Sequence, residues 1–268
     1  MELSFAHSPC PNDTFTFFGI ASKRVFLDGH SITVCHHDIE SLNSFAFSGK
    51  YEITKLSFHA LLLLGNRYRL LRAGNALGYG CGPILVSQHS VQKSDLAGLR
   101  IVLPGEHTTA HLLLRLYCPE AQHRTFVSYD RIFDEILADR ADCGVVIHES
   151  RFLYEEKGLR KICDLGQWWE ETTKSPIPLG AIAVRNDVPT DMDEAIEKAI
   201  RESLMLVRNE PALAQSYIRG LAREMDDAVI QKHIGMFVNE FTMDIGDQGM
   251  RSIEQLKVMA RSAGIVSW

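Results

Sequence analysis

His148 is the side chain in this sequence that is best placed to transfer a proton. It follows the apolar run Cys143–Ile147, which predicts a buried strand, and Glu149 comes directly after it. A neutral imidazole accepts a proton near neutral pH, and a neighbouring carboxylate can orient it or tune its basicity. The sequence therefore offers His148 as a candidate general base, with a purely structural histidine as the alternative.

A second candidate is the turn Gly105–Ala110, which contains Thr108 and Thr109. It stands between a predicted strand over residues 99–103 and a predicted helix over residues 107–117. N–H groups at a helix N-terminus, together with nearby hydroxyls, form a site for an anion such as a carboxylate. Plain capping of the helix by a threonine is the alternative. No lysine of the Walker type follows the turn, which argues against a nucleoside triphosphate.

A third candidate is the group Lys55, Leu56 and Ser57, at another junction between a strand and a helix. The strand is predicted over residues 51–55 and the helix over residues 58–64. Ser57 is well placed to cap this helix, which would give it a structural role without any ligand. The group faces the same predicted cleft as the threonine turn.

The segment Ser8–Phe15 forms a stiff turn after a predicted first strand over residues 2–7. Its two prolines fix their own φ and keep the residues before them out of the α region. Asn12 and Asp13 are good N-cap residues for the helix that follows. Polar groups are thereby held at the carboxyl end of a strand, where ligands of open α/β sheets bind. Whether the Cys10 thiol faces such a site is left open.

Three other sequence patterns resemble known metal or nucleotide sites, but the residues around them argue against that function. His36 and His37 are adjacent on a predicted strand and point to opposite faces, which keeps them from sharing a metal ion. Gly78, Gly80 and Gly82 precede a strand rather than a helix, which favours close backbone approach over dinucleotide binding. The six cysteines contain no C-x-x-C pair. We therefore expect no metal and no nucleotide cofactor.

The composition is that of an ordinary globular protein. Of 268 residues, 46% are hydrophobic and 23% are charged, and the net charge is -6. This charge argues against a nucleic-acid partner, and it means that an anionic small molecule needs a locally favourable pocket. The N-terminus carries no export signal, and no apolar run approaches the roughly 20 residues of a membrane helix. We expect a cytoplasmic protein with reduced thiols and no membrane partner.

Two successive α/β cycles predict the architecture. Strands and helices alternate over the first ninety residues, and the same rhythm restarts after Ser94. This order predicts mostly parallel sheets with helices on both faces. Residues 164–180 contain two prolines and predict an irregular stretch, whereas the chain from Asp191 onward is helical.

Extended crossings near residues 83–88 and 179–185 bracket the second cycle. They divide the chain into a first lobe over residues 1–88, a second lobe over 89–182, and a mostly helical return to the first lobe over 183–268. A binding site in the cleft between the lobes follows from this arrangement, because such clefts collect loops from both sheets.

Six motifs match one family in order. They are Ser8–Phe15 (SPCPNDTF), Asp38–Asn43 (DIESLN), Thr54–Ala60 (TKLSFHA), Gly78–Pro83 (GYGCGP), Thr108–Ala110 (TTA) and Val146–Glu149 (VIHE). On these motifs the chain resembles the 1,4-dihydroxy-6-naphthoate synthases of the futalosine route to menaquinone. Beyond about residue 185 the resemblance rests on pattern and length. It implies an α/β, two-lobed fold of the periplasmic-binding-protein type II kind.

The resemblance also implies a function. It is that of a lyase that converts cyclic dehypoxanthine futalosine to 1,4-dihydroxy-6-naphthoate and dihydroxyacetone, without a redox cofactor or metal. It implies His148 as the proton acceptor, and substrate contacts to Lys55, Leu56, Ser57, Thr109 and Ala110, with Asn43 as a weaker addition. A cytoplasmic organic-anion-binding module of the same fold and a chorismate-processing relative are the alternatives. The sequence does not indicate an oligomeric state.

Overall fold

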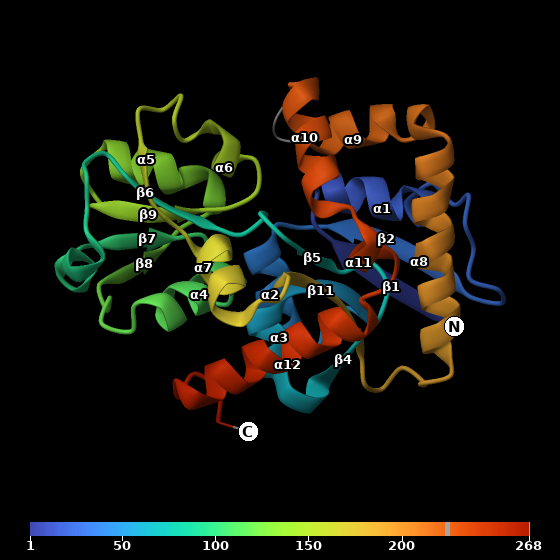
Figure 1. Ribbon diagram of the computed structural model, residues 1–268. Helices are drawn as coiled ribbons and strands as arrows, with labels where there is room; N and C mark the ends of the chain where they lie inside the picture. Colours follow the sequence, from blue (N-terminus) through green and yellow to red (C-terminus); the bar gives the residue numbers. More distant parts are fainter. Residues whose placement is uncertain (223–225, 268) are drawn as a thin grey trace.

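The computed structural model describes residues 1–222 and 226–267, which form two α/β lobes (Figure 1). The sheet of the first lobe has the strand order β2–β1–β3–β11–β4, and β5 pairs with β11. Its strands are β1 (Glu2–His7), β2 (Ser31–His36), β3 (Ile53–Ser57), β4 (Tyr68–Leu70), β5 (Ala76–Gly78) and β11 (Ile177–Arg185). Strand β1 is parallel to β2 and β3, whereas β11 is antiparallel to β3, β4 and β5.

The sheet of the second lobe has the strand order β10–β6–β9–β7–β8. Its strands are β6 (Ile84–Ser87), β7 (Ile101–Leu103), β8 (Arg124–Phe126), β9 (Cys143–Val146) and β10 (Arg160–Asp164). Strand β7 is parallel to β8 and β9, whereas β6 is antiparallel to β9 and β10. Both sheets are mixed, so the prediction of mostly parallel sheets is wrong at β6 and β11. These strands enter from the other lobe and run against their neighbours.

The chain crosses from lobe to lobe twice. Strand β6 already belongs to the second sheet, and β11 belongs to the first. The first crossing therefore lies before Ile84 and the second before Ile177. Both come a few residues earlier than the boundaries at residues 88 and 182 that the sequence led us to expect.

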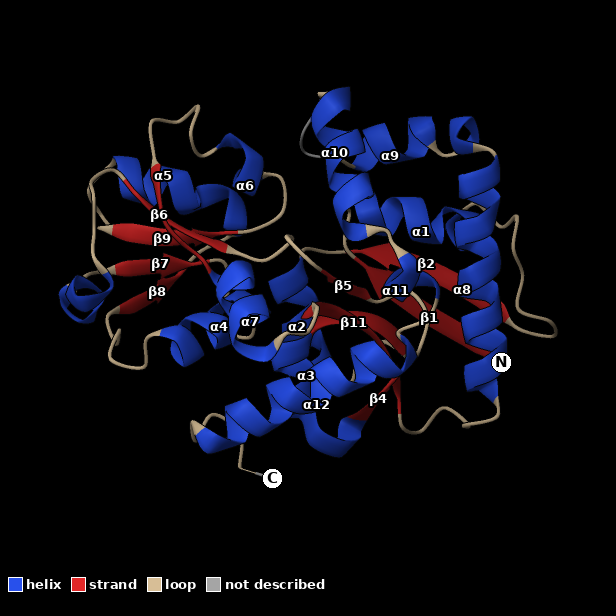
Figure 2. Ribbon diagram, in the orientation of Figure 1, coloured by secondary structure: helices blue, strands red, loops and turns tan. Residues whose placement is uncertain are grey.

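Helices cover both faces of each sheet (Figure 2). In the first lobe, α1 (Pro11–Ala21) and α8 (Met192–Asn209) pack on one face, and α2 (Ile39–Ser48) and α3 (Phe58–Leu64) pack on the other. In the second lobe, α5 (Ile132–Leu137) lies on one face, with α4 (Thr109–Tyr117) and α7 (Leu165–Thr173) on the other. The short helix α6 (Ser150–Leu153) follows β9.

Helix α7 lies in the stretch that was expected to be irregular. Asp164 caps it by accepting a hydrogen bond from the N–H of Gly166 at 2.9 Å. Trp169 is fully buried, and its indole N–H donates to the carbonyl of Pro176 at 3.2 Å. The burial of this tryptophan stabilises the helix, and the two prolines come after its end rather than inside it.

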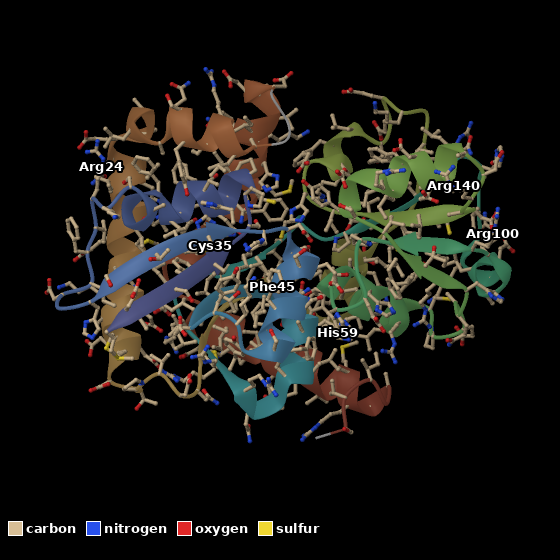
Figure 3. All side chains as sticks on the ribbon, turned by 180° about the vertical axis from the view of Figure 1, so that it is seen from behind. Arg24, Cys35, Phe45, His59, Arg100 and Arg140 are labelled. Carbon is tan, nitrogen blue, oxygen red and sulfur yellow. The ribbon has the colours of Figure 1, made fainter. Side chains whose placement is uncertain are left out.

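The C-terminal helices pack mainly on the first lobe. They are α8, α9 (Gln215–Leu221), α10 (Asp227–Phe237), α11 (Glu240–Met243) and α12 (Gly246–Ser262). Helices α9 and α10 contact α1, while α12 runs along β11 and reaches α4 of the second lobe. Charged side chains such as Arg24, Arg100 and Arg140 cover the outer surface (Figure 3). No helix within residues 1–222 and 226–267 is long and apolar enough to cross a membrane.

The two lobes share one hydrophobic core at the first crossing. A single cluster of buried side chains includes Phe58 of α3 and Leu85 of β6. Next to it the backbones of Gly82 and Gly166 touch, and a Cβ atom on Gly82 would lie only 2.3 Å from the Cα atom of Gly166. The close backbone approach that we predicted for this glycine-rich segment is therefore confirmed at Gly82.

Candidate functional site

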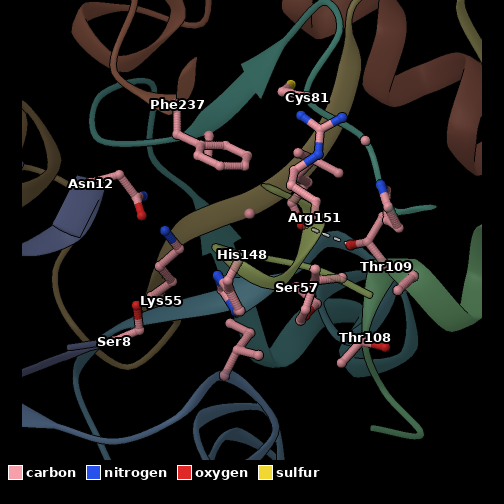
Figure 4. A pocket seen from close by; sticks show the side chains of 18 of the residues that line it. Ser8, Asn12, Lys55, Ser57, Cys81, Thr108, Thr109, His148, Arg151 and Phe237 are labelled. Atoms are coloured by element: carbon pink, nitrogen blue, oxygen red, sulfur yellow. Dashed lines mark hydrogen bonds between the residues drawn. The ribbon is translucent and has the colours of Figure 1, made fainter. Parts of the chain in front are cut away.

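A cleft with an empty volume of about 660 Å³, part of it open to solvent, contains side chains of both lobes. Its polar lining comes from Ser8, Asn12, Lys55, Ser57, Thr108, Thr109, His148, Arg151 and His233. Its apolar lining includes Ile39, Ala76, Pro83, Ile147, Leu179 and Phe237. His148 stands between two polar groups (Figure 4). We call the side with Ser8, Asn12 and Lys55 the charged end, and the side with Ser57, Thr109 and Ala110 the hydroxyl end.

A buried ion pair organises the charged end. Lys55 Nζ pairs with Asp13 Oδ1, and the two side chains are 8% and 2% exposed. Asp13 also accepts hydrogen bonds from the Ser8 hydroxyl at 2.6 Å and from Asn12 Nδ2 at 2.8 Å. A buried carboxylate is stable when its oxygens are paired in this way. Asp13 therefore fixes the three polar side chains of this wall.

The first helix begins earlier than the sequence predicted. Cys10 is the N-cap residue and Pro11 occupies the first helical position, so the prediction that Asn12 or Asp13 caps the helix is wrong. Proline suits this position because its φ is already helical and it has no N–H to satisfy. The polar side chains of Asn12 and Asp13 are consequently free to build the charged end.

Ser57 is held at the hydroxyl end by Asn43. The amide oxygen of Asn43 accepts from the Ser57 backbone N–H at 2.9 Å, and its Nδ2 donates to Ser57 Oγ at 3.1 Å. Ser57 is the N-cap residue of α3, yet its side chain makes no capping bond. Because its oxygen accepts from Asn43, the hydroxyl proton is available to a ligand. Asn43 is fully buried and does not line the cleft, so it is a positioning residue.

Leu56 lies on the other face of β3. Successive residues of a strand point to opposite faces, so Lys55 and Ser57 line the cleft while Leu56 does not. Its side chain is fully buried in a cluster with Ala46 and Ala183. A contact between Leu56 and a ligand therefore stays a prediction, and its side chain is not placed to make one.

The N-terminus of α4 completes the hydroxyl end. Thr108 caps the helix by accepting from the N–H of His111 at 3.3 Å. The hydroxyl of Thr109 donates to the carbonyl of Leu179, on β11 of the first lobe, at 2.7 Å. The N–H groups of Thr109 and Ala110 belong to the first turn, where a helix provides no partner. Both threonines line the cleft, but only Thr108 also caps the helix, whereas the hydroxyl of Thr109 joins the two lobes.

Glu40 connects the hydroxyl end to the second lobe. Its carboxylate accepts from the backbone N–H of His107 at 3.0 Å and lies 2.8 Å from the ring of the same histidine. It also accepts from Asn43 Nδ2 at 3.1 Å. Gly105 leaves room for this contact, since a Cβ atom there would lie 2.5 Å from the carboxylate. The side chain that positions Ser57 is therefore tied to both lobes.

His148 follows β9 in a left-handed backbone conformation, with φ of 52°. This conformation is uncommon for a residue other than glycine and is often found at functional sites. Its Nδ1 lies 3.4 Å from the sulfur of Cys10. Burial raises the pKa of Cys10 to about 12, so the thiol is neutral. Cys10 itself lines a smaller cavity beside the cleft, together with Glu149.

Arg151 is a cationic side chain of the cleft that the sequence analysis did not identify. It is 8% exposed and donates from Nη1 to the carbonyl of Gly80 at 2.7 Å. Its Nη2 lies 3.5 Å from a carboxylate oxygen of Asp164, and burial lowers its pKa. Arg151 supplies positive potential to a protein whose net charge is -6.

His233 and Phe237 also line the cleft and were not identified. Both come from α10, in the part of the chain where no motif pointed to function. Their helical spacing of four residues places them on one face, a pattern equally typical of an ordinary buried helix. Ser8 and Asn12, in contrast, lie in the SPCPNDTF segment, where the turn itself indicated polar groups at a strand end.

The chain belongs to a family of menaquinone-biosynthesis proteins, whose model matches residues 3–262. The particular members that it resembles are named 1,4-dihydroxy-6-naphthoate synthase. The protein from Thermus thermophilus is 40% identical over 265 residues, which cover 99% of this chain and 96% of the relative. The protein from Streptomyces coelicolor is 36% identical, with 98% of this chain and 94% of the relative covered. The resemblance seen in the sequence motifs is thereby confirmed.

Solved structures confirm the fold. A crystal structure of a protein from Archaeoglobus fulgidus is 34% identical and superposes with a TM-score of 0.92, covering 99% of this chain and 98% of the other. The alkanesulfonate-binding protein of Xanthomonas axonopodis shares 11% identity and a TM-score of 0.75, with 100% and 94% of the chains covered. The expected two-lobed fold of the periplasmic-binding-protein kind is therefore correct.

Proposed function

We propose that this chain is a lyase that converts cyclic dehypoxanthine futalosine to 1,4-dihydroxy-6-naphthoate and dihydroxyacetone. The names of its relatives support the product. The observation that carries the chemistry is the position of His148 between the charged end and the hydroxyl end of one cleft. A base in that position reaches the middle of a ligand whose two ends are held by different groups.

His148 acts as the general base in this proposal. His148 Nδ1 and the sulfur of Cys10 lie 3.4 Å apart, and either of them can carry the shared proton. In the tautomer with the proton on Nδ1, the lone pair is on Nε2 and accepts a proton from the substrate. The Cys10 thiol stays protonated because burial raises its pKa to about 12, so it does not compete as a base. The ring of His148 is positioned by its packing against Tyr129, with 4.9 Å between ring centroids, and by the nearly parallel ring of His233 at 6.1 Å.

The hydroxyl end binds the carboxylate of the substrate. Ser57 offers a hydroxyl proton, and the N–H groups of Thr109 and Ala110 add donors at a helix N-terminus. The hydroxyl proton of Thr109 is already used by Leu179, so this side chain contributes chiefly by joining the lobes. The apolar lining between the ends suits an aromatic ring.

One experiment tests the proposal directly. Purified protein is incubated with cyclic dehypoxanthine futalosine, and the naphthoate and dihydroxyacetone are measured by mass. Equal amounts of the two products support the proposal. Tight binding of the compound without turnover would instead support an organic-anion-binding module, the alternative that the fold also serves in the sulfonate-binding protein. A cytoplasmic location stays a prediction.

A further inference from the structure

Three buried histidines each have one ring nitrogen without a hydrogen-bond partner among the described residues. These atoms are Nε2 of His7, Nε2 of His59 and Nδ1 of His233. Of the three, His233 lines the cleft and the other two do not. It is 1% exposed and comes from α10, close to the charged end.

The surroundings of His233 fix which nitrogen carries the proton. Asn12 uses Nδ2 to donate to Asp13 Oδ1 at 2.8 Å, so it presents its carbonyl oxygen to His233. Nε2 of His233 lies 2.9 Å from that oxygen and therefore donates to it. A neutral ring with its proton on Nε2 has a lone pair on Nδ1. Burial lowers the pKa of His233 well below its ordinary value, with His148, Lys55 and Arg151 adding to the effect, so the ring stays neutral.

A buried acceptor without a donor is unfavourable. The ring of His233 packs against Phe237 with 4.7 Å between centroids and lies nearly parallel to His148 at 6.1 Å. Neither contact supplies a proton to Nδ1. The missing donor is therefore best supplied by a ligand in the cleft.

We propose that Nδ1 of His233 accepts a hydrogen bond from a hydroxyl group of the substrate, in the polyhydroxylated part that leaves as dihydroxyacetone. This inference rests on the proposed function. A carboxylate has no proton to give and would be repelled by the lone pair, so the carboxylate belongs at the hydroxyl end. The charged end has an acceptor in Ser8 and a cationic donor in Lys55, and His233 beside it adds a second acceptor. This mixture matches alcohol groups, which both donate and accept.

Two substitutions separate the two nitrogens of His233. His233→Gln places an amide N–H near the position of Nε2 and keeps the bond to Asn12, but removes the acceptor at Nδ1. His233→Asn places an oxygen near the position of Nδ1 and loses the bond to Asn12. His36→Gln is the matched control, because His36 bonds to the hydroxyl of Tyr217 and does not line the cleft.

The expected result is a KM for the cyclic substrate that rises about 3- to 10-fold in His233→Gln, the size of one neutral hydrogen bond, and less in His233→Asn. The dissociation constant of the naphthoate product should stay unchanged in both variants. His36→Gln should keep the wild-type KM. Urea unfolding of each variant verifies that the measured protein is folded.

Two results of the variant measurements would overturn the inference while leaving the proposed function intact. A wild-type KM in His233→Gln, with His233→Asn impaired, would show that His233 serves only to hold Asn12. An equal loss of naphthoate affinity would place His233 at the aromatic part of the ligand.

Absence of turnover in the wild-type protein would contradict the proposed function and this inference with it. If either variant fails to fold, the ¹⁵N resonance of His233 Nδ1 is measured instead in His148→Asn protein, which is expected to bind the substrate with little turnover. A resonance that does not move on saturation with substrate would also overturn the inference.

Discussion

The two ends of the cleft hold polar groups by different means. At the charged end, the side chains of Ser8, Asn12 and Lys55 converge on the Asp13 carboxylate and satisfy one another. At the hydroxyl end, Ser57 and the first N–H groups of α4 offer protons without a paired carboxylate within the lining. Ser8, Asn12 and Lys55 are thus paired within the protein through Asp13, whereas Ser57, the first N–H groups of α4 and the neighbouring His233 Nδ1 keep hydrogen-bonding capacity for a ligand.

We expect this difference to allow a protein with a net charge of -6 to bind an anionic ligand. A buried lysine alone would attract a carboxylate, but Lys55 already has Asp13 as its partner. Neutral donors at the hydroxyl end need no buried counter-charge and so cost less to desolvate. We therefore expect the ligand to bind with its anionic group directed away from Asp13.

The largest expected effect concerns His148, which stands between the two ends. His148→Asn cannot take a proton, and asparagine tolerates the left-handed backbone that this position requires. We expect turnover to fall roughly 10²- to 10⁴-fold, the usual contribution of a positioned base, with little change in substrate affinity. The ascending limb of the wild-type pH profile should be absent from the variant. Near-normal turnover in the folded variant would rule out His148 as the base.

The next largest effect is expected when the buried ion pair at the charged end is removed. Lys55→Met leaves Asp13 as a buried carboxylate without its cation, which should lower the free energy of unfolding by about 3–5 kcal/mol. The double variant Lys55→Met with Asp13→Asn should recover most of that loss, because no uncompensated charge remains. Urea unfolding at pH 7 measures both. Equal stabilities of the single variant and the wild type would contradict the role given to this ion pair.

The hydroxyl end can be tested without changing any charge. Ser57→Ala removes a hydroxyl proton that we expect to reach the ligand carboxylate, and should weaken binding of the naphthoate by about 1–3 kcal/mol. Thr109→Val should cost less, because its hydroxyl proton is directed at Leu179. Calorimetric titration gives both constants. A larger loss in Thr109→Val than in Ser57→Ala would reverse the assignment of the two hydroxyls.

A smaller effect is expected on the pH dependence of stability, and it comes from two buried neutral histidines, one behind each end of the cleft. His7 donates to the carbonyl of Ser8 at the charged end, and burial lowers its pKa to about 4. His59 contacts the carbonyl of Thr108 at the hydroxyl end, and burial lowers its pKa to about 3. Both take up a proton more readily when the chain unfolds.

The unfolded chain therefore binds more protons between about pH 6.5 and pH 4, and stability falls as the pH falls through this range. Each histidine contributes at most about 1.4 kcal/mol per pH unit. Urea unfolding of His7→Phe and His59→Phe over this range should show a shallower pH dependence than the wild type. An unchanged slope in both variants would mean that folding lowers the pKa of neither ring.

The last prediction is that removal of metal ions has no effect on turnover. The sequence contains no residues at metal-ligand spacing. Treatment of the protein with a chelator should therefore leave its turnover rate unchanged. Activity that is lost to the chelator and restored by one divalent metal would contradict this prediction.

The sequence predicted most elements of the fold, because hydrophobic periodicity and turn residues decide them locally. It failed where side chains serve the site instead of the nearest helix. Asp13 and Ser57 are both good capping residues, yet neither side chain caps its helix. One binds Lys55, and the other binds Asn43. Such departures from local rules are expected at functional sites.

Two other features depended on contacts that no local pattern contains. Helix α7 is stabilised by the burial of Trp169 against residues far away in the chain. His233 reaches Asn12 across 221 positions of sequence. The SPCPNDTF and VIHE motifs located Asn12 and His148 because strand ends collect ligands, but α10 offered no comparable signal.

The contact between Gly82 and Gly166 has a consequence for how this chain can change during evolution. Two backbones touch there, so any side chain on Gly82 would collide with backbone atoms rather than with a movable side chain. A substitution at one position cannot be rescued by a smaller residue at the other, since no smaller residue exists. Both positions should therefore remain glycine in descendants that keep this crossing, even where the ligand changes.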